Sequence, residues 1–211
     1  CFSNHEVIEF MLNALGNQSR DILLIQDNEG HNAFHSLMIY QEWFTIKYIE
    51  ELLQEDIERF LTITDLDGLA PLHLAIHRQG TDLAHNVLAL YKKYNCNATT
   101  LKTKRHCTVL HEAIHFQTAE VLQEFVEMYG DNIGKALLET DDEGYTGLHV
   151  AAQYQNGKIL TNFCKFVAKK KLKKSLRVGE CDGWTVLHYS AKHQKIEFIK
   201  YAIKKLGSEA C

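Results

Sequence analysis

The stretch "DGLAPLHLAIH", residues 67–77, recurs in altered form along the whole chain. Five copies align on a histidine that follows a leucine or phenylalanine. The aligned histidines are His35, His73, His111, His149 and His188. Consecutive histidines lie 38, 38, 38 and 39 residues apart. Because a fixed period of this length is the signature of repeat architectures, the sequence predicts stacked copies of one structural unit.

The residues around each histidine also recur, and each has a physical role. Five residues upstream, four repeats have glycine (Gly30, Gly68, Gly144, Gly183), whereas the third has His106. A glycine after acidic residues predicts a tight turn. Three residues upstream, Thr108, Thr146 and Thr185 are suited to cap a helix N-terminus. Pro71 suits the first position of a helix, where its missing N–H costs nothing.

A second helix is predicted after each first one. In the third repeat, apolar residues recur at helical spacing at Val121, Leu122, Phe125, Val126 and Tyr129. In the last repeat, they recur at Ile196, Phe198, Ile199, Ala202 and Ile203. The segment "NHEVIEFMLNALG" near the N-terminus has the same pattern without a first helix. Further residues follow the second helices, and they carry Leu61, Leu101 and Leu138. We interpret them as an added apolar turn in each repeat.

The segments "DGLAPLHLAIH" and "EGYTGLHVAA" resemble the D-x-x-G-x-T-P-L-H-x-A unit of ankyrin repeats. Ankyrin units usually recur at about 33 residues, so each repeat here carries about five more. Glutamine also stands where the family usually has a turn glycine: Gln41, Gln79, Gln117, Gln155 and Gln194. The resemblance implies an all-α ankyrin-repeat solenoid of helix-turn-helix units with hairpin fingers. Its expected boundaries are a partial repeat 1–26, repeats 27–64, 65–102, 103–140 and 141–179, and a C-terminal repeat 180–211, all in one domain.

Composition narrows the functional classes. The 211 residues are 45% hydrophobic and 24% charged, with a formal net charge of −4. This balance argues against general nucleic-acid binding, and no apolar run is long enough to span a bilayer. None of the six cysteines forms a C-x-x-C pair, which favours reduced, packing cysteines in an intracellular protein. The N-terminus does not have the layout of a secretory signal, so we expect a cytoplasmic or nuclear protein. It also lacks an initial Met, so we expect this chain to be one domain of a longer protein. We expect that domain to be monomeric.

One motif suggests an enzyme. "HEAIH", residues 111–115, matches the H-E-x-x-H signature of zinc metalloproteases, in which two histidines bind zinc and the glutamate is the general base. His111 is the aligned histidine of the third repeat, while Glu112 and His115 stand at variable positions. Glu139 is the one downstream candidate for a third ligand, and it belongs to the connection between repeats. A zinc metallohydrolase therefore stays an alternative, and we expect no cofactor and no catalysis.

The resemblance implies that partners bind along the face formed by hairpin tips and first helices. The positions four and five after each aligned histidine are rich in aromatic and cationic residues, which are enriched at interface hot spots. The tips add an acidic–basic–acidic series of charges that could set a partner's register. The candidate partner-binding residues are Tyr40, His77, Arg78, Arg105, His115, Phe116, Tyr145, Tyr154, Trp184 and His193.

A lysine-rich run, "KKKLKKSLR" at residues 169–177, has three interpretations. It can be a nuclear-import signal, an anion-binding patch, or the solvated end of a second helix, where lysines complement the helix dipole. We expect the last.

The function that we predict is a scaffold or adaptor domain that binds another protein. Alternatives are an inhibitor domain of the NF-κB type and an ankyrin domain of a channel or a pathogen effector.

Overall fold

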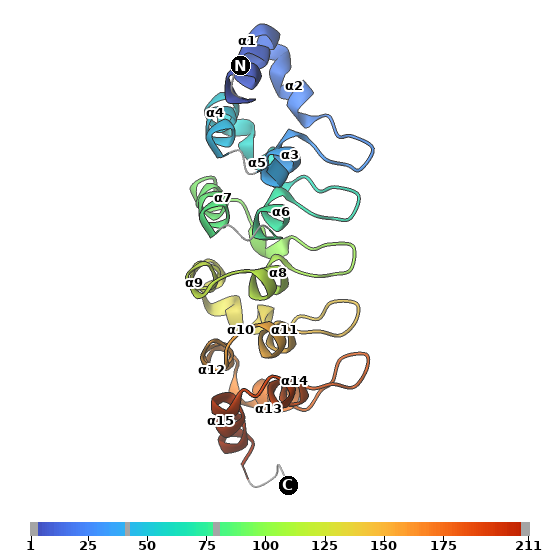
Figure 1. Cartoon of the computed structure of the whole chain (residues 1–211), viewed down its shortest axis with the longest axis vertical. Helices are drawn as coiled ribbons and strands as arrows, with labels where there is room; N and C mark the ends of the chain where they lie inside the picture. Colours follow the sequence, from blue (N-terminus) through green and yellow to red (C-terminus); the bar gives the residue numbers. More distant parts are fainter. Residues whose placement is uncertain (1–3, 41–42, 78–80, 208–211) are drawn as a thin grey trace. The chain divides into compact units, whose positions relative to one another are not determined.

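The computed structural model describes residues 4–40, 43–77 and 81–207 (Figure 1). It is mostly helical, as predicted, and the described residues form no sheet. Two isolated antiparallel bridges occur, Thr140 with Thr146 and Gly179 with Thr185. No helix in the described part of the chain is both long and apolar enough to cross a bilayer.

The chain divides into two compact units, which we call the N-terminal half (residues 1–104) and the C-terminal half (residues 105–211).

The N-terminal half begins with the helix predicted for the partial repeat, α1, which is followed by the short helix α2. Two helix pairs come next, α3 with α4 and α6 with α7, and α3 packs against α6. The elements are α1 (Asn4–Leu15), η1 (Gly16–Gln18), α2 (Ser19–Leu24), α3 (Ala33–Tyr40), α4 (Trp43–Leu53), η2 (Gln54–Asp56), α5 (Ile57–Thr62), α6 (Pro71–His77), α7 (Thr81–Lys93) and η3 (Ala98–Thr100).

The C-terminal half contains three helix pairs, α8 with α9, α11 with α12 and α14 with α15. The first helices α8, α11 and α14 lie side by side, and α12 packs against α15 (Figure 1). The elements are α8 (Val109–Phe116), α9 (Ala119–Tyr129), η4 (Gly130–Asn132), α10 (Ile133–Ala136), α11 (Gly147–Tyr154), α12 (Gly157–Phe166), α13 (Lys169–Ser175), α14 (Val186–Lys192) and α15 (Ile196–Leu206).

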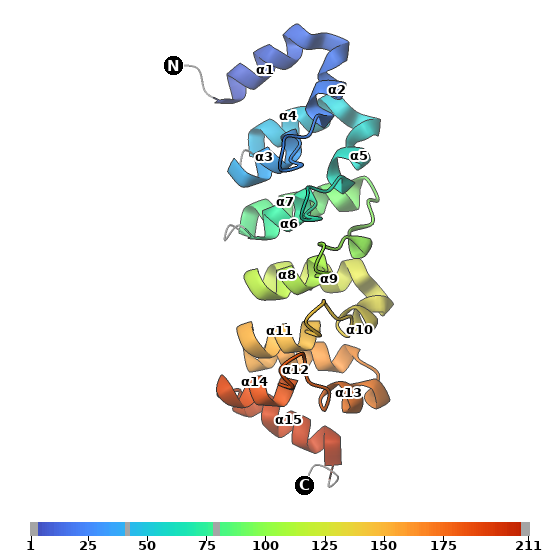
Figure 2. The ribbon, with the colours of Figure 1, turned by 90° about the vertical axis from the view of Figure 1, so that its right-hand side faces the viewer.

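Short helices occupy the extra residues of the long repeats, as the apolar-turn interpretation predicted. Figure 2 shows α10 and α13 at one edge of the C-terminal half, beyond the ends of α9 and α12. Leu61 and Leu101 are buried as expected, but Leu138 is half-buried. Leu137, one residue earlier, is fully buried in its place, because α10 turns that residue toward the core.

The first helices begin where the sequence predicted. Thr108, Thr146 and Thr185 are N-caps whose hydroxyls accept a hydrogen bond from the backbone N–H three residues later. Pro71 is the first residue of α6. These caps satisfy backbone donors that a helix start leaves without partners, so these three repeats fix where their first helices start.

The loops before the first helices share one turn geometry. Asp65 Oδ1 accepts from the backbone N–H groups of Asp67 and Leu69 at 2.8 Å each, and Asp141 repeats this arrangement. Gly30, Gly68, Gly144 and Gly183 all have positive φ, between 79° and 84°. His106, which replaces this glycine in the third repeat, also has positive φ, 56°. The predicted turns are therefore confirmed, including the one that lacks glycine.

Adjacent loops are joined by backbone hydrogen bonds. In the N-terminal half, Leu66 N–H donates to Glu29 O at 3.0 Å, and Lys104 N–H donates to Asp67 O at 2.8 Å. In the C-terminal half, Asp142 N–H donates to Arg105 O at 3.0 Å, and the next loop repeats the bond from Cys181 to Glu143 at 2.8 Å. Each loop thus holds its neighbour at a fixed spacing without forming a sheet.

The second helices differ from prediction at the end of the chain. Val121, Leu122, Phe125 and Tyr129 of α9 are buried, with Val126 half-buried, so the apolar spacing there is confirmed. In α15, Phe198 and Ala202 are buried, but Ile196 and Ile203 are 61% and 56% exposed. The side of α15 that carries these two isoleucines has no described helix packed on it, whereas the preceding α12 is covered by α15 itself.

The cysteines of the described segments are partly as predicted. Cys96 and Cys164 are buried, and burial raises their thiol pKa values to about 11 and about 12, so these thiols stay protonated. Cys181 is exposed, which contradicts the expectation of a packing role there. Cys1 and Cys211 lie outside the described residues.

Candidate functional site

Three of the aligned histidines, His35, His111 and His149, connect one repeat to the next. The Nδ1 atom of His111 accepts a hydrogen bond from the backbone N–H of Thr108, its own N-cap. Its Nε2 atom lies 3.1 Å from Glu139 O, in the connection to the following repeat. His149 bonds to Thr146 and Val178 O in the same way, with the carbonyl 3.2 Å from Nε2. In the N-terminal half, His35 Nε2 lies 2.9 Å from Leu69 O.

These contacts define the protonation state of the rings. Because Nδ1 accepts from a backbone N–H, the single proton of the neutral ring must be on Nε2, which donates to the carbonyl. Burial lowers the pKa values of His35, His111 and His149 below the usual histidine value. We infer that these three histidines are neutral structural donors, not pH sensors or metal ligands.

The zinc-protease motif has no zinc-site geometry. Both ring nitrogens of His111 are hydrogen-bonded, to Thr108 and to Glu139 O. The carboxylate of Glu112 accepts a hydrogen bond from the Cys107 thiol at 3.3 Å. The ring of His115 is stacked between other side chains, described below. A zinc ion bound by this motif would have to break the inter-repeat bond of His111.

Within the described ranges, a different group brings together possible metal ligands, Glu180, Cys181 and Asp182. The oxygens of Glu180 already accept from the Cys181 thiol at 3.1 Å and from the backbone N–H groups of Asp182 and Trp184 at 2.9 and 3.0 Å. Despite the opposing effect of burial, these bonds keep the pKa of the Glu180 carboxyl below its usual value. The same contacts form the turn of the last repeat, so they have a structural explanation.

Three of the predicted binding residues form an aromatic stack at the ends of α8 and α11. The His115 ring lies on Tyr154 with centroids 3.7 Å apart, and on Phe116 with centroids 4.0 Å apart. Phe116 is 39% exposed and Tyr154 is 48% exposed. Two consecutive repeats thus present one continuous, partly open aromatic surface, which we call the aromatic stack.

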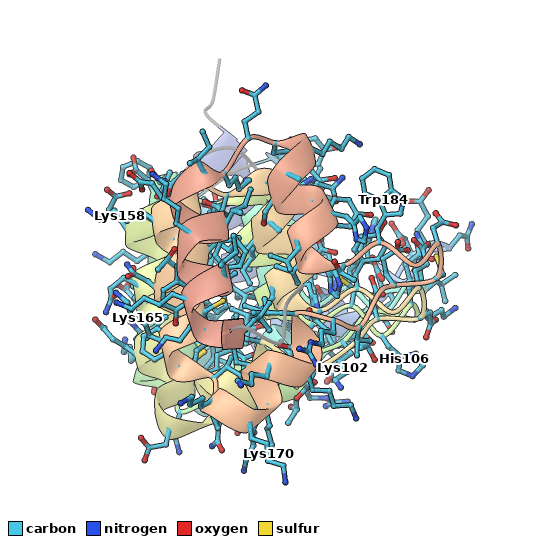
Figure 3. The ribbon with its side chains drawn as sticks, turned by 90° about the horizontal axis from the view of Figure 1, so that it is seen from below. Lys102, His106, Lys158, Lys165, Lys170 and Trp184 are labelled. Atoms are coloured by element: carbon cyan, nitrogen blue, oxygen red, sulfur yellow. The ribbon has the colours of Figure 1, made fainter. Side chains whose placement is uncertain are left out.

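Two further predicted residues, Tyr145 and Trp184, meet in a second cluster in the last two repeats. Tyr145 and Tyr189 share a hydrogen bond between their hydroxyls at 2.8 Å, and Trp184 lies on Tyr189 with centroids 5.3 Å apart. The Lys192 ammonium lies 5.3 Å from the centre of the Trp184 ring. Trp184 is still 39% exposed, and Figure 3 shows it on the side of the loops. We call this group the tryptophan cluster.

The basic loop tip has intramolecular partners. Arg105 forms an ion pair with Glu143 of the next loop, and His106 Nδ1 lies 2.6 Å from an oxygen of Asp142. The predicted acidic–basic–acidic series is therefore partly neutralised inside the chain. Arg105 keeps 74% of its side chain exposed, so a partner can still contact it.

The other predicted residues lie at the ends of first helices. Tyr40 ends α3 and is 74% exposed, His77 ends α6 and is half-buried, and His193 follows α14 and is exposed. Arg78 lies outside the described residues.

Sequence reasoning missed Tyr189, which completes the tryptophan cluster together with Lys192. Tyr189 stands one position after the aligned histidine, where the other repeats have Ser36, Leu74, Glu112 and Val150, and this variability gave no signal. Lys192 belongs to the aromatic and cationic positions, but only its contact with Trp184 distinguishes it from a solvated lysine.

One of the unusual glutamines has a clear structural role. Gln155 Nε2 donates to Ile114 O at 2.7 Å and to Gln117 O at 3.2 Å, so it binds the end of the preceding first helix. Gln41 and Gln79 fall outside the described segments.

No protein-family model and no curated protein sequence matches this chain.

Proposed function

We propose that the chain is an ankyrin-repeat solenoid with a non-catalytic function, the binding of a partner protein. The repeat motif supports the family assignment, because its five aligned histidines recur at nearly constant spacing. The capping boxes of Thr108, Thr146 and Thr185 with the following histidines give that motif a consistent structural meaning.

The aromatic stack carries the proposal. Large aromatic side chains that stay partly open to solvent at adjacent helix ends are typical of interface hot spots. His115, Phe116 and Tyr154 bury one another in part, so they are held in place before a partner arrives. Such preorganisation reduces the conformational entropy that binding would otherwise cost.

The tryptophan cluster adds a second partly exposed aromatic group in the last two repeats. Lys192 over Trp184 offers a cation beside an aromatic plane, and Arg105 offers a second cation at a loop tip. We expect a partner that supplies apolar side chains to the aromatic stack and carboxylates to these two cations.

A capture experiment tests this proposal. The purified chain is compared with a variant carrying His115→Ala, Phe116→Ala and Tyr154→Ala, and captured proteins are identified by mass spectrometry. Phe44→Ala is the control, because Phe44 lies on the second helix α4 and is 78% exposed. We expect at least one protein that the wild type and the control capture and the triple variant loses.

Photo-crosslinking locates the contact. A photoreactive phenylalanine analogue is placed at position 154, and at position 44 in the control. A crosslink to the captured protein from position 154 alone supports the proposal. Equal capture by all variants, or crosslinks from position 44 alone, would contradict the assigned surface.

A further inference from the structure

Charge is strongly segregated along the sequence. Residues 1–150 contain 23 acidic and 10 basic side chains, a formal charge of −13, whereas residues 151–211 contain 4 acidic and 13 basic ones, a formal charge of +9. The modest net charge of −4 conceals this division. A local excess of this size creates a strong field at one part of the molecule.

The lysines of this segment gather on three helices that pack together in the C-terminal half, α12, α13 and α15. Leu172 anchors α13 in the core, with 3% of its surface exposed, while the lysines around it face solvent. Figure 3 shows Lys165 and Lys170 away from the loop side that carries Trp184. We define the lysine surface as the exposed lysines of the single short helix α13, Lys169, Lys170, Lys171 and Lys174.

Helix stability does not explain Lys169, Lys170 and Lys171. The second helix α12 ends at Phe166, and Lys169, Lys170 and Lys171 form the first turn of the separate helix α13. The run is therefore not the end of the second helix, although Lys173 and Lys174 do lie in the last turn of α13, where cations complement the helix dipole. Cations at a helix N-terminus oppose the helix dipole, and like charges three or four residues apart repel one another. Within the described ranges, none of these three lysines lies within ion-pair distance of a carboxylate.

Apolar side chains are exposed beside the lysines. Phe166, directly before α13, is 45% exposed, and Ile203, next to Lys204 on α15, is 56% exposed. Phe166 and Lys165 also line an apolar groove of about 310 Å³ between α9 and α12. Cations mixed with exposed apolar groups suit the boundary between lipid headgroups and acyl chains.

The residue type favours a lipid surface over a nucleic acid. The basic residues of the segment are 12 lysines and one arginine. Arginine is the residue that recognises phosphates and bases with a defined bidentate geometry, whereas lysine acts as a point charge. Clusters of several lysines on a surface helix are typical of binding to anionic phospholipids. A long nucleic acid would also extend past the basic segment, in a chain that is otherwise acidic.

We propose that the lysine surface docks the protein peripherally on a bilayer that contains anionic phospholipids. Vesicle co-sedimentation tests this inference, with phosphatidylcholine vesicles that either contain or lack phosphatidylserine. The wild type is compared with a variant carrying Lys169→Gln, Lys170→Gln and Lys171→Gln. The control carries Lys47→Gln, Lys92→Gln and Lys104→Gln, which change the net charge equally at exposed positions of the N-terminal half.

The wild type and the control should bind the anionic vesicles, more weakly as salt rises, and should not bind the neutral ones. The lysine-surface variant should bind roughly a hundred-fold more weakly, since each lysine near an anionic leaflet strengthens binding about five-fold. Equal binding by both variants, or equal binding of the wild type to both vesicle types, would overturn the proposal. Duplex DNA at equal phosphate concentration is the third ligand, and tighter binding to DNA than to anionic vesicles would also overturn it.

Discussion

The Nε2 atom of His149 lies 3.2 Å from the carbonyl oxygen of Val178, 29 residues later in the chain. Its Nδ1 atom accepts from the backbone of Thr146 at the start of its own helix. One buried ring therefore caps a helix and holds the connection to the next repeat. His111 does the same one repeat earlier with Thr108 and Glu139. The capping function needs the neutral ring, because protonation at Nδ1 removes the acceptor, whereas Nε2–H can donate to the carbonyl in either protonation state.

We expect stability to fall as the pH drops below about 6.5, the ordinary histidine pKa. Burial lowers the pKa values of His35, His111 and His149 in the folded protein. Between the folded and unfolded pKa values, the unfolded chain therefore binds more protons, and unfolding free energy rises with pH. The contribution is complete above the unfolded pKa and is lost as pH falls toward the folded values.

Urea unfolding of the whole chain between about pH 5 and 8 measures this dependence, because histidine is the side chain that titrates in this range. The variant His111→Asn with His149→Asn should be less stable at neutral pH but should show a shallower pH slope. An unchanged slope in that variant would assign the pH dependence to other groups.

Two glycines with the same φ separate backbone strain from steric contact. Gly68 and Gly183 both have a φ of 79°. A Cβ atom on Gly68 would lie 2.8 Å from the backbone nitrogen of Lys104, whereas a Cβ on Gly183 would have no neighbour within 4 Å among the described residues. Gly183→Ala should therefore cost about 1 kcal/mol, from the left-handed backbone alone. Gly68→Ala should cost more by at least about 1 kcal/mol, because the loops must separate. Chemical denaturation of both variants measures the difference, and equal losses would show that the loops yield without cost.

Much of this fold could be predicted from the sequence, because its signals are local. The threonine and histidine of each capping box are three residues apart, and the turn glycines stand at a constant offset from them. The start of α13 gave no such signal. The segment from Phe166 to Lys169 contains neither glycine nor proline, so the break after α12 depends on packing that periodicity does not record.

The candidate surface was predictable only in part, since its contacts connect residues from different repeats. The aromatic stack could be anticipated, because His115, Phe116 and Tyr154 stand at matching positions of adjacent repeats. Tyr189 could not, because its bond to Tyr145 depends on how closely α11 and α14 approach. The pairing of Arg105 with Glu143 likewise appears only when the loops are placed side by side.

Neutralising the first turn of α13 should stabilise the protein slightly. Lys169→Gln, Lys170→Gln and Lys171→Gln remove cations from a helix N-terminus and relieve the repulsion with Lys173 and Lys174. We expect a rise in Tm of about 1–3 °C at low ionic strength, which should shrink as salt screens the charges. Differential scanning calorimetry at two salt concentrations measures the rise. A fall in Tm would show that these lysines have stabilising contacts, and the vesicle result would then need a second, stability-matched variant.

Gln155 and Gln194 stand at the same position of successive repeats and should respond in different ways. Gln155 binds Ile114 O and Gln117 O. Gln155→Ala leaves both carbonyls without this donor, and it should cost about 1–2 kcal/mol of unfolding free energy. Gln194 instead has a φ of 54°, a conformation that glycine adopts without strain. The variant Gln194→Gly relieves about 1 kcal/mol of backbone strain in the folded protein. Glycine also gives the unfolded chain more conformational freedom, which offsets this gain. The unfolding free energy should therefore change by less than about 0.5 kcal/mol. Urea denaturation of the two variants gives the comparison, and a loss in Gln194→Gly as large as that in Gln155→Ala would mean that both glutamine side chains stabilise their repeats.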